Sequence, residues 1–374
     1  MKRQIQVEDS PEKPRKQQRL ETSTREDAVG LTEALDFSAL SSLQEISGRF
    51  DELARSLMFG HVIHLHMPGF PPKEIEYEIL ELEFYLHKRG CHADPFTHRA
   101  AEQKRSGQWY FHRTPTSTGV SATSYRGGSR KGMDLTFGSP VGPLPSSESE
   151  TDSDSTRGGI LLRTIRRVDN QKVISGPSRL VDEILAQSGA QSISDLVQSK
   201  WKGDTLAFSS AVPGSRPSLR IIPRKKHSAT ANLFRCPRIG LDLSHKSTVN
   251  SPRNPRITFV CKPYRYIVNP ELLTFNGRPQ TFIGVYDNLS ESTGGNTAKL
   301  VKAIADVTGI QKPTVLTYIE SFNLGLEGKR RLDGFIRAKT RSVADYLTMV
   351  GALRRQSSSV IVIESDSEVE QVNA

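Results

Sequence analysis

Residues 74–86 read EIEYEILELEFYL and form the most strongly patterned segment of the sequence. Apolar side chains alternate with polar ones through its second half: Leu80, Leu82, Phe84 and Leu86 against Glu81, Glu83 and Tyr85. Because successive side chains of a β-strand point to opposite faces, this period of two predicts a strand with one apolar, core-facing side. Glu81, Glu83 and Tyr85 then share the other face, which brings two carboxyl groups and a phenol together.

Other apolar stretches predict the neighbours of this strand. They are QWYFH at 108–112, KGMDLTFG at 131–138, GGILLRTIRRV at 158–168, PRIGLDL at 237–243 and KPYRYIV at 262–268. The first two suggest a pair of strands joined by a loop rich in Ser, Thr and Gly. Strands and helices mix without a strict βαβ alternation. We therefore expect an α+β fold, a single domain around a curved, mixed or antiparallel sheet.

Amphipathic stretches predict helices around these strands. Apolar residues recur at helical spacing around 47–58. A second helix is expected at 175–189, where Ser175 would cap it and Pro177 would open it. Residues 297–355 are also mostly helical in pattern.

The composition predicts a folded centre between disordered ends. Hydrophobic residues make up 36 % of the 374 residues, below the roughly 45–50 % that is usual for globular proteins. We expect the following organisation: a disordered tail at 1–40, a domain at 41–274 with disordered insertions near 139–157 and 209–230, a helical region at 275–355, and a disordered acidic tail at 356–374.

The charge balance indicates a polyanionic partner. Lys and Arg outnumber Asp and Glu by 51 to 41, and the acids crowd near 148–154 and 364–370, which leaves a basic body. Three scattered cysteines argue against a disulfide framework or a zinc site. No His, Asp and Glu cluster has the spacing of metal ligands, so a metal enzyme is not expected. No apolar run reaches the ~20 residues of a membrane span, and the polar, basic N-terminus suits nuclear import better than secretion.

Seven short motifs together carry a resemblance to a known family. They are LARSLMFG at 53–60, ILELEFYL at 79–86, DPFTH at 94–98, GGILLR at 158–163, SGPSRLVDEIL at 175–185, PRIGL at 237–241 and KPYRYIV at 262–268. In this order they resemble the alkyladenine (3-methyladenine) DNA glycosylase family. The resemblance implies a domain that binds double-stranded DNA and rotates a damaged purine nucleotide into a pocket. It also implies hydrolysis of the N-glycosidic bond without a metal or cofactor.

The same resemblance implies roles for individual residues. Glu83 matches the family's catalytic carboxylate, which activates water and stabilises the positively charged sugar. Arg163 matches the arginine that ends the LLR strand and is expected to hold Glu83 or the target phosphate. Tyr85, His98 and His112 match the base pocket, with Tyr85 stacking on the flipped base. From the residues alone, structural roles remain open: a solvent-facing carboxylate, a packing tyrosine, surface histidines and a salt-bridged arginine.

Two positions depart from the family's pattern. Lys131 stands where the family has an aromatic wedge, and Gly138 where it has an Asn at the base edge. The surrounding segment instead places Arg126, Arg130 and Lys131 among glycines, which predicts a loop that clamps DNA phosphates. A solvated loop without such a role is the alternative.

The C-terminal third carries two further motifs. Residues 298–322 resemble a helix-turn-helix in which Gln311 and Lys312 face a DNA groove; two helices packed for stability alone would look similar. VIVIESDSE at 360–368 resembles a SUMO-interacting motif, an extended segment that adds to the sheet edge of a partner. Its apolar residues are Val360, Ile361, Val362 and Ile363.

Two functions from different classes follow. The first is a nuclear, monomeric DNA repair glycosylase that acts on alkylated or deaminated purines with Glu83 as its base. The second is a catalytically inactive DNA-binding adaptor that recruits SUMO-modified proteins. Retention of Glu83, Tyr85, His98 and Arg163 favours the enzyme, whereas the changes at Lys131 and Gly138 favour the adaptor.

Overall fold

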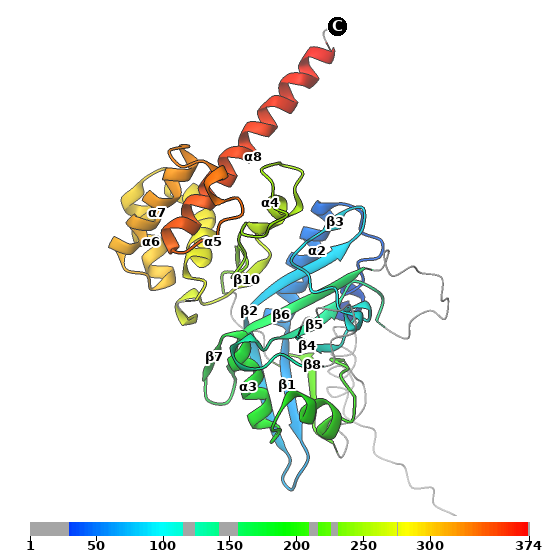
Figure 1. The fold of residues 1–374 in the computed structure, drawn as a ribbon. Coiled ribbons are helices and arrows are strands. Elements are labelled where there is room, and N and C mark those ends of the chain that lie inside the picture. The colour runs from blue at the N-terminus through cyan, green and yellow to red at the C-terminus, as the bar shows by residue number, and fades with distance from the viewer. Residues whose placement is uncertain are drawn as a thin grey trace, which may run out of the picture.

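A large antiparallel sheet forms the centre of the molecule, and helices cover it and gather at one end (Figure 1). The computed structural model describes residues 30–114, 124–141, 156–208, 216–225, 231–274 and 276–372, with side chains up to residue 357. The expected α+β class is confirmed, and the sheet is not closed into a barrel.

All strand pairings within the described residues are antiparallel. The strands are β1 (His61–Met67), β2 (Lys73–Lys88), β3 (His92–Ala93), β4 (Trp109–Phe111), β5 (Met133–Phe137), β6 (Arg157–Arg167), β7 (Val173–Ser175), β8 (Ser218–Pro223), β9 (Phe234–Cys236) and β10 (Arg265–Ile267). The main order is β4-β5-β6-β2-β1-β8. Strands β3 and β10 also pair with β2, β7 pairs with β6, and β9 pairs with β10.

Strand β2 organises the sheet because it pairs with four other strands. Its apolar side is the predicted one: Leu82 and Phe84 are fully buried, and the Phe84 ring stacks on Phe50 with 4.4 Å between centroids. The polar side is buried as well, since Glu81 is 3 % exposed and Glu83 is 0 % exposed. Two buried carboxyl groups are costly unless they are paired, so this side must also hold their partners.

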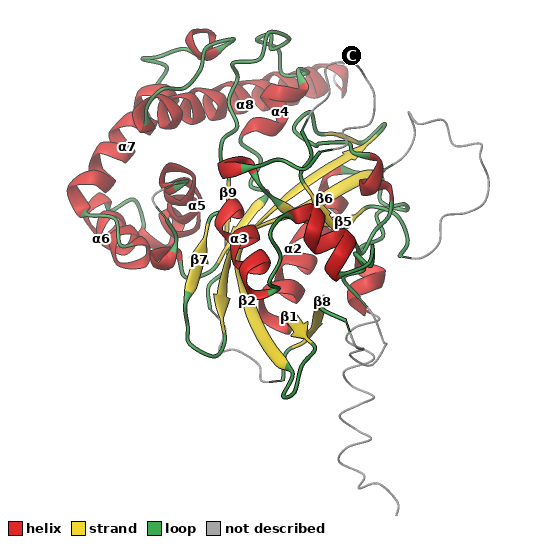
Figure 2. Cartoon of the chain, turned by 60° about the horizontal axis from the view of Figure 1, so that its bottom comes forward, coloured by secondary structure: helices red, strands yellow, loops and turns green. Residues whose placement is uncertain are grey.

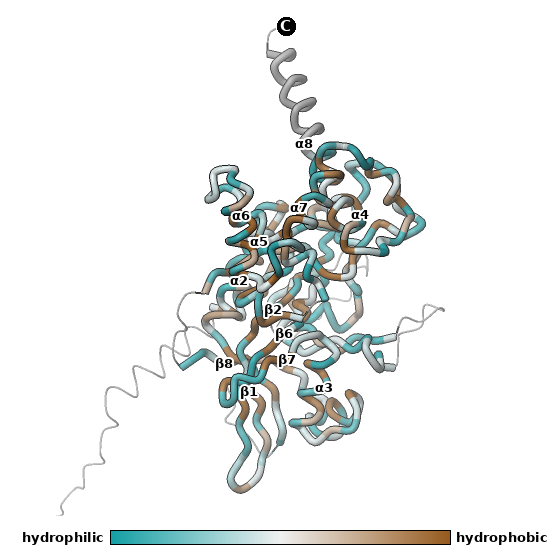
Figure 3. Tube along the Cα trace, turned by 90° about the vertical axis from the view of Figure 1, so that its left-hand side faces the viewer, coloured by the Kyte–Doolittle hydropathy of each residue, from teal (hydrophilic) through white to brown (hydrophobic). Residues whose placement is uncertain are grey.

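The helices divide between two hydrophobic cores (Figure 2). They are α2 (Leu43–Arg55), α3 (Pro177–Gln187), α4 (Pro255–Val260), α5 (Arg278–Ser290), α6 (Thr297–Thr308), α7 (Lys312–Leu326) and α8 (Val343–Val372). Helices α2 and α3 share the main core with β2 and β6, whose hydrophobic stretches are visible in Figure 3. Helices α5 to α8 build the second core with residues of β9 and β10. Among the described residues, none of these helices has both the length and the apolar character needed to cross a bilayer.

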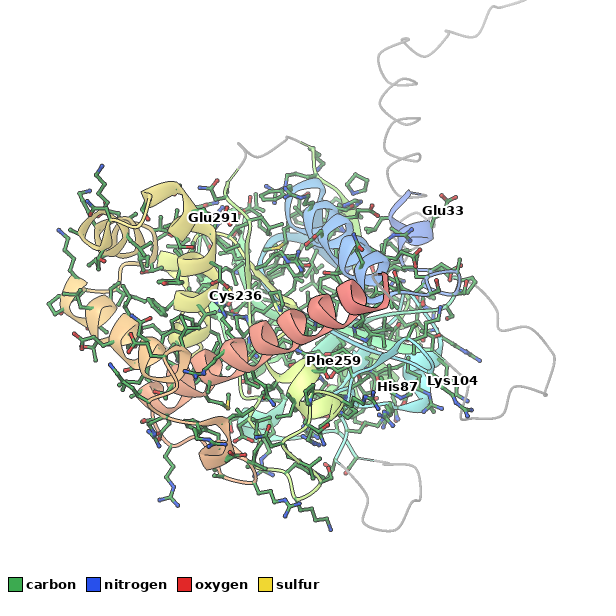
Figure 4. The ribbon with its side chains drawn as sticks, turned by 90° about the horizontal axis from the view of Figure 1, so that it is seen from above. Glu33, His87, Lys104, Cys236, Phe259 and Glu291 are labelled. Carbon is green, nitrogen blue, oxygen red and sulfur yellow. The ribbon has the colours of Figure 1, made fainter. Side chains whose placement is uncertain are left out.

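Direct contacts between β9, β10 and α5 join the two cores. Arg265 of β10 donates to Glu81 Oε1 through Nε at 2.6 Å and to Thr281 Oγ1 through both terminal nitrogens at 3.1 Å. A Cβ at Gly284 of α5 would lie 2.3 Å from Cys236 Sγ, so only glycine allows this approach. Cys236, labelled in Figure 4, is the residue that α5 approaches through Gly284. The helical region is therefore packed directly on the sheet.

The structure corrects two of the predicted disordered segments. Leu31, Leu35 and Phe37 belong to the tail expected at 1–40, but they are at most 2 % exposed and belong to the main core. A few apolar residues do not stand out in a window dominated by Glu, Ser and Thr. Within the insertion expected near 209–230, residues 218–223 form β8 and pair with β1. The short apolar pattern of SLRIIP was not recognised as a strand, because Pro, Ser and basic residues flank it on both sides.

Two local predictions were also wrong. PRIGLDL does not continue as a strand: β9 ends at Cys236, and Gly240 has a φ of +80°, a left-handed conformation that stops an extended strand. Ser175 does not cap α3, whose N-cap is Gly176 without a side-chain hydrogen bond. Ser175 is instead the last residue of β7, and its hydroxyl lies 3.0 Å from that of Thr164.

Helix α8 runs into the acidic tail that was expected to be disordered, and it includes residues 360–363, which were expected to be extended. A helix nucleated by packing at its first turns extends at little cost, because each added residue gains one hydrogen bond. The side chains of Val360, Ile361, Val362 and Ile363 lie outside the described part of the chain. The SUMO-interacting motif stays a prediction.

Helices α7 and α8 cross at two glycines. A Cβ at Gly325 would lie 2.0 Å from the carbonyl oxygen of Thr348, and one at Gly351 would lie 2.1 Å from that of Phe322. The two backbones therefore touch at this crossing, where Thr348 Oγ1 donates to the carbonyl oxygen of Ser321 at 2.8 Å.

We predict that Gly351→Ala lowers the free energy of unfolding by about 1–3 kcal/mol, the usual effect of overpacking. The matched control is Gly48→Ala in α2, where nothing lies within 4 Å of the added methyl group. This control should raise stability by roughly 0.5–1 kcal/mol through helix propensity. Urea denaturation measures both variants. Equal effects of the two substitutions would contradict the crossing.

Candidate functional site

The carboxyl group of Glu83 is the centre of the candidate site. Its Oε1 accepts the backbone N–H of Ile239 at 2.8 Å, and its Oε2 accepts the Tyr85 hydroxyl at 2.8 Å and Arg163 at 3.4 Å. The bend at 239–240, where a strand was expected, therefore brings a backbone donor onto this carboxylate. The predicted pair of Glu83 and Arg163 is brought together.

Arg163 of β6 lies between the two carboxylates of β2. Its Nε donates to Glu81 Oε1 at 3.1 Å, and the same oxygen accepts Arg265. Burial alone raises the pKa of Glu81, but the charges of Arg265 and Arg163 outweigh burial and hold this pKa below its usual value. Burial opposes the charged form of Arg163, and the charges of Glu83 and Glu81 raise its pKa in spite of that.

Tyr85 connects Glu83 to a neighbouring cavity. Burial and the negative charge of Glu83 raise the pKa of Tyr85 well above its usual value, so its hydroxyl stays protonated and donates to Glu83. The Arg238 guanidinium lies 4.5 Å from the centre of the Tyr85 ring and is fixed by an ion pair with Asp94 at 2.5 Å. Arg238 and Asp94 are fully buried.

The cavity has a volume of about 320 Å³ and is lined by all three residues predicted for the base pocket, Tyr85, His98 and His112. This volume is within the ~300–1,000 Å³ of small-molecule sites. The rest of the lining includes apolar and polar residues: Phe96, Gln103, Arg126, Asp134, Leu161, Gly240 and Leu241. Glu83 does not line the cavity. Both Tyr85 and the 239–240 bend touch Glu83, so the carboxylate lies one hydrogen bond behind the cavity wall.

A carboxylate and two imidazoles meet on one side of this cavity. Tyr110 of β4 pairs with Asp134 of β5, and His112 follows two residues after Tyr110, so all three side chains share one face of the sheet. His112 Nε2 lies 2.8 Å from Asp134 Oδ1. His98 comes from the loop after β3, and its ring centroid is 4.3 Å from that of His112 in an edge-to-face arrangement.

The electrostatic surroundings keep His98 neutral. Although its side chain is open to the cavity, the protein atoms around the ring desolvate it and lower its pKa to about 4. The neighbouring His112 ring also lowers this pKa, whereas the charge of Asp134 raises it. A neutral imidazole can accept a hydrogen bond or bind a metal ion.

The residues predicted to contact DNA fall into two places. Arg126 lines the cavity, and its Nε donates to the carbonyl oxygen of Arg113 at 2.9 Å. Arg130 is exposed in the adjoining helical turn, Gly128–Arg130. Lys131 forms an ion pair with Asp182 of α3, so it is not available as a wedge in this arrangement. Gln311 and Lys312 are exposed at the start of α7 and do not line the cavity.

Several residues of the site were missed by sequence reasoning. Asp134 looks like a polar position in a half-buried strand, and only the pairing of β4 with β5 places it beside His112. Arg238 and Arg265 lie within motifs that were read as strands, but their partners are far away in the sequence. The one available signal was that Arg within an apolar run requires a buried partner.

We predict that His98 titrates near pH 4 in the folded protein, because desolvation disfavours its imidazolium form. Ring-proton chemical shifts followed by NMR between pH 3 and 8 measure this value; the assignment is made with His98→Gln. In Asp134→Asn the pKa of His98 should fall further, since a favourable negative charge is lost. Titration near the ordinary value of about 6.5 would show that the ring is freely hydrated.

Comparison with known proteins identifies one similar sequence and no family. No family model matches the chain. An uncharacterized protein of Acanthamoeba polyphaga mimivirus is 34 % identical over 121 residues, which are 32 % of this chain and 52 % of that protein. The chain therefore spans about half the length of this curated relative. The site described above is the basis on which a function can be argued.

Proposed function

We propose that this chain is a DNA glycosylase of the alkyladenine type. It flips a damaged purine nucleotide out of duplex DNA and hydrolyses its N-glycosidic bond. The observation that carries the proposal is a fully buried carboxylate, Glu83, one hydrogen bond behind a cavity lined by Tyr85, His98 and His112. An ordinary carboxylate on a strand would be exposed to bulk solvent, whereas Glu83 is fully buried.

The hydrogen bonds of Glu83 suit a general base. Each carboxylate oxygen offers two acceptor positions. Both positions on Oε2 are used by Tyr85 and Arg163, whereas Oε1 accepts the Ile239 N–H and no other donor among the described residues. The remaining position on Oε1 can accept a proton from water once nucleotide binding moves the wall formed by Tyr85 and the 239–240 bend, because Glu83 is fully buried and does not line the cavity. The water oxygen then bonds to the sugar carbon, and the purine leaves with the electrons of the broken N-glycosidic bond. The same carboxylate stabilises the positive charge that develops on the sugar.

The cavity supports recognition of a flipped base. Tyr85 offers an aromatic surface, and base stacking on such a ring is worth ~1–3 kcal/mol. The imidazoles of His98 and His112 offer polar contacts to a purine edge. Arg126 at the cavity and Arg130 in the exposed turn beside it suit the phosphates around the flipped nucleotide. The net charge of +10 favours association with DNA in general.

We predict that Glu83→Gln lowers the rate of base release by about 10²–10⁴-fold, the usual contribution of a general base. Single-turnover release from duplexes that contain hypoxanthine, ethenoadenine or an alkylpurine measures this effect. The matched control is Glu76→Gln, on the same strand, whose carboxylate pairs with Lys225 at 3.4 Å and touches none of the residues above. This control should keep the parental rate.

Two outcomes would oppose the proposal in different ways. Full activity of the Glu83→Gln variant would remove Glu83 from the chemistry. If the parent released no base from any of these duplexes but still bound DNA, the inactive adaptor would be favoured. The changes at Lys131 and Gly138 would then be the features that mark the loss of activity.

We further propose that the enzyme acts in the nucleus and is recruited by SUMO-modified proteins through the tail. Four β-branched residues followed by acids suit strand addition to a partner with a basic rim. The replacement of Val360, Ile361, Val362 and Ile363 by Ala should abolish SUMO binding in calorimetry and leave base release unchanged. The tail residues Val369 and Val372, each changed to Ala, serve as the control. Undiminished affinity of the four-residue variant would reject this part of the proposal.

A further inference from the structure

We infer that His98, His112 and Asp134 form a binding site for one divalent transition-metal ion, such as Zn²⁺ or Fe²⁺. One ligand atom of each residue lies within 4.8 Å of the other two. Among the described residues, these three side chains are close enough together to share one ion. The inference goes beyond the proposed function, because metal binding requires neither DNA nor Glu83.

The donor set selects the class of metal. Two imidazoles and one carboxylate are the ligands of catalytic zinc sites and of the non-haem iron facial triad, in which other coordination positions stay open. Ligand atoms ~2.0–2.2 Å from one ion lie roughly 3–4 Å apart. His112 Nε2 and Asp134 Oδ1 are 2.8 Å apart and share a hydrogen bond, which an ion between them would replace. The ligand atom of His98 lies within 4.8 Å of both. Calcium and magnesium prefer oxygen ligands and suit this site less well.

The strands hold two of the three ligands in place. His112 follows β4 directly, and its backbone N–H donates to the carbonyl oxygen of Gly132 at 3.0 Å. A Cβ at Gly132 would lie 2.5 Å from the His112 ring. At Gly159 a Cβ would lie 2.5 Å from Asp134 Oδ2. Both ligand side chains thus pack against glycine backbone, where an added methyl group would displace them.

The residues around the three ligands bear on how the site would hold a cation. Gln103 Nε2 lies 3.5 Å from Asp134 Oδ2 and can orient the carboxylate. Arg126 also lines the cavity and opposes a cation by its charge. Together with the ion it would favour an anionic or electron-rich ligand in the cavity.

Open coordination positions would face the space in which a base is proposed to sit. Water, or a ring nitrogen of a purine, could occupy them. This last point rests on the proposed function, whereas the metal site itself does not. In that case His98 and His112 would contact the purine through the ion and not directly.

The test is metal binding in the absence of DNA, on the full chain freed of metal by a chelator. Isothermal titration with Zn²⁺ should show one ion bound per chain, and Co²⁺ should give visible d–d absorption. Asp134→Asn and His98→Gln should each weaken Zn²⁺ binding at least ~10-fold. Even the loss of a residue that only orients a metal ligand costs about this much. Loss of the Co²⁺ absorption in the same variants would locate the ion.

The matched control is His66→Gln. His64 and His66 each lie 2.6 Å from an oxygen of Glu74 and form a second cluster of imidazoles and a carboxylate, at the edge of β1 and β2. This variant should bind Zn²⁺ as tightly as the parent. Loss of binding in His66→Gln alone, or equal affinity in the parent and in Asp134→Asn, would overturn the inference. Because the His98 side chain is exposed, His98→Gln still decides the matter if Asp134→Asn does not fold.

Metal binding and base release can fail separately. If the site holds an ion but Glu83→Gln releases bases normally, the proposed function is wrong and the metal site stands. If base release is lost in Glu83→Gln while no Zn²⁺ binds in calorimetry, the reverse holds.

Discussion

The structure depends on the pairing of two buried carboxylates on β2 with guanidinium groups from β6 and β10. Glu81 and Glu83 are two residues apart and nearly without solvent contact, and Arg163 contacts both. Removing either sign of charge would leave the other uncompensated in the interior, where an unpaired ion is strongly destabilising. The network therefore restricts the relative position of the strands that build the site, and it places a carboxylate where water has little access.

The two carboxylates of this network have different partners. Glu81 is held by Arg163, Arg265 and Thr164 and serves the fold. Glu83 shares Arg163 but also contacts Tyr85 and a bend in the chain, both of which reach the cavity. Two acids on the same face of one strand thus differ in their surroundings, because Glu83 alone contacts residues that reach the cavity. Their alternation in sequence gives no hint of that difference.

Much of the central sheet was predictable from the sequence, because β2, β4, β5, β6 and β10 have local apolar patterns. The motifs that resemble a glycosylase family led us to group Glu83 with Arg163, and Tyr85 with His98 and His112; these side chains lie together in the structure. What could not be predicted depends on distant contacts. Asp134 meets His112 through strand pairing, and the Ile239 N–H reaches Glu83 through a bend that reads as a strand. Burial of Leu35 and Phe37 is decided by a surface that forms only after folding.

The link from Arg265 to Thr281 has a consequence for how this chain can be divided. A fragment that ended after the last strand would expose Phe234, Cys236 and Ile267, and it would leave the Arg265 guanidinium without its hydroxyl partner beneath Glu81. The C-terminal helices thus cover apolar residues of β9 and β10 and are not an appended module. An ancestor that lacked them would have needed another cover for the same apolar strands.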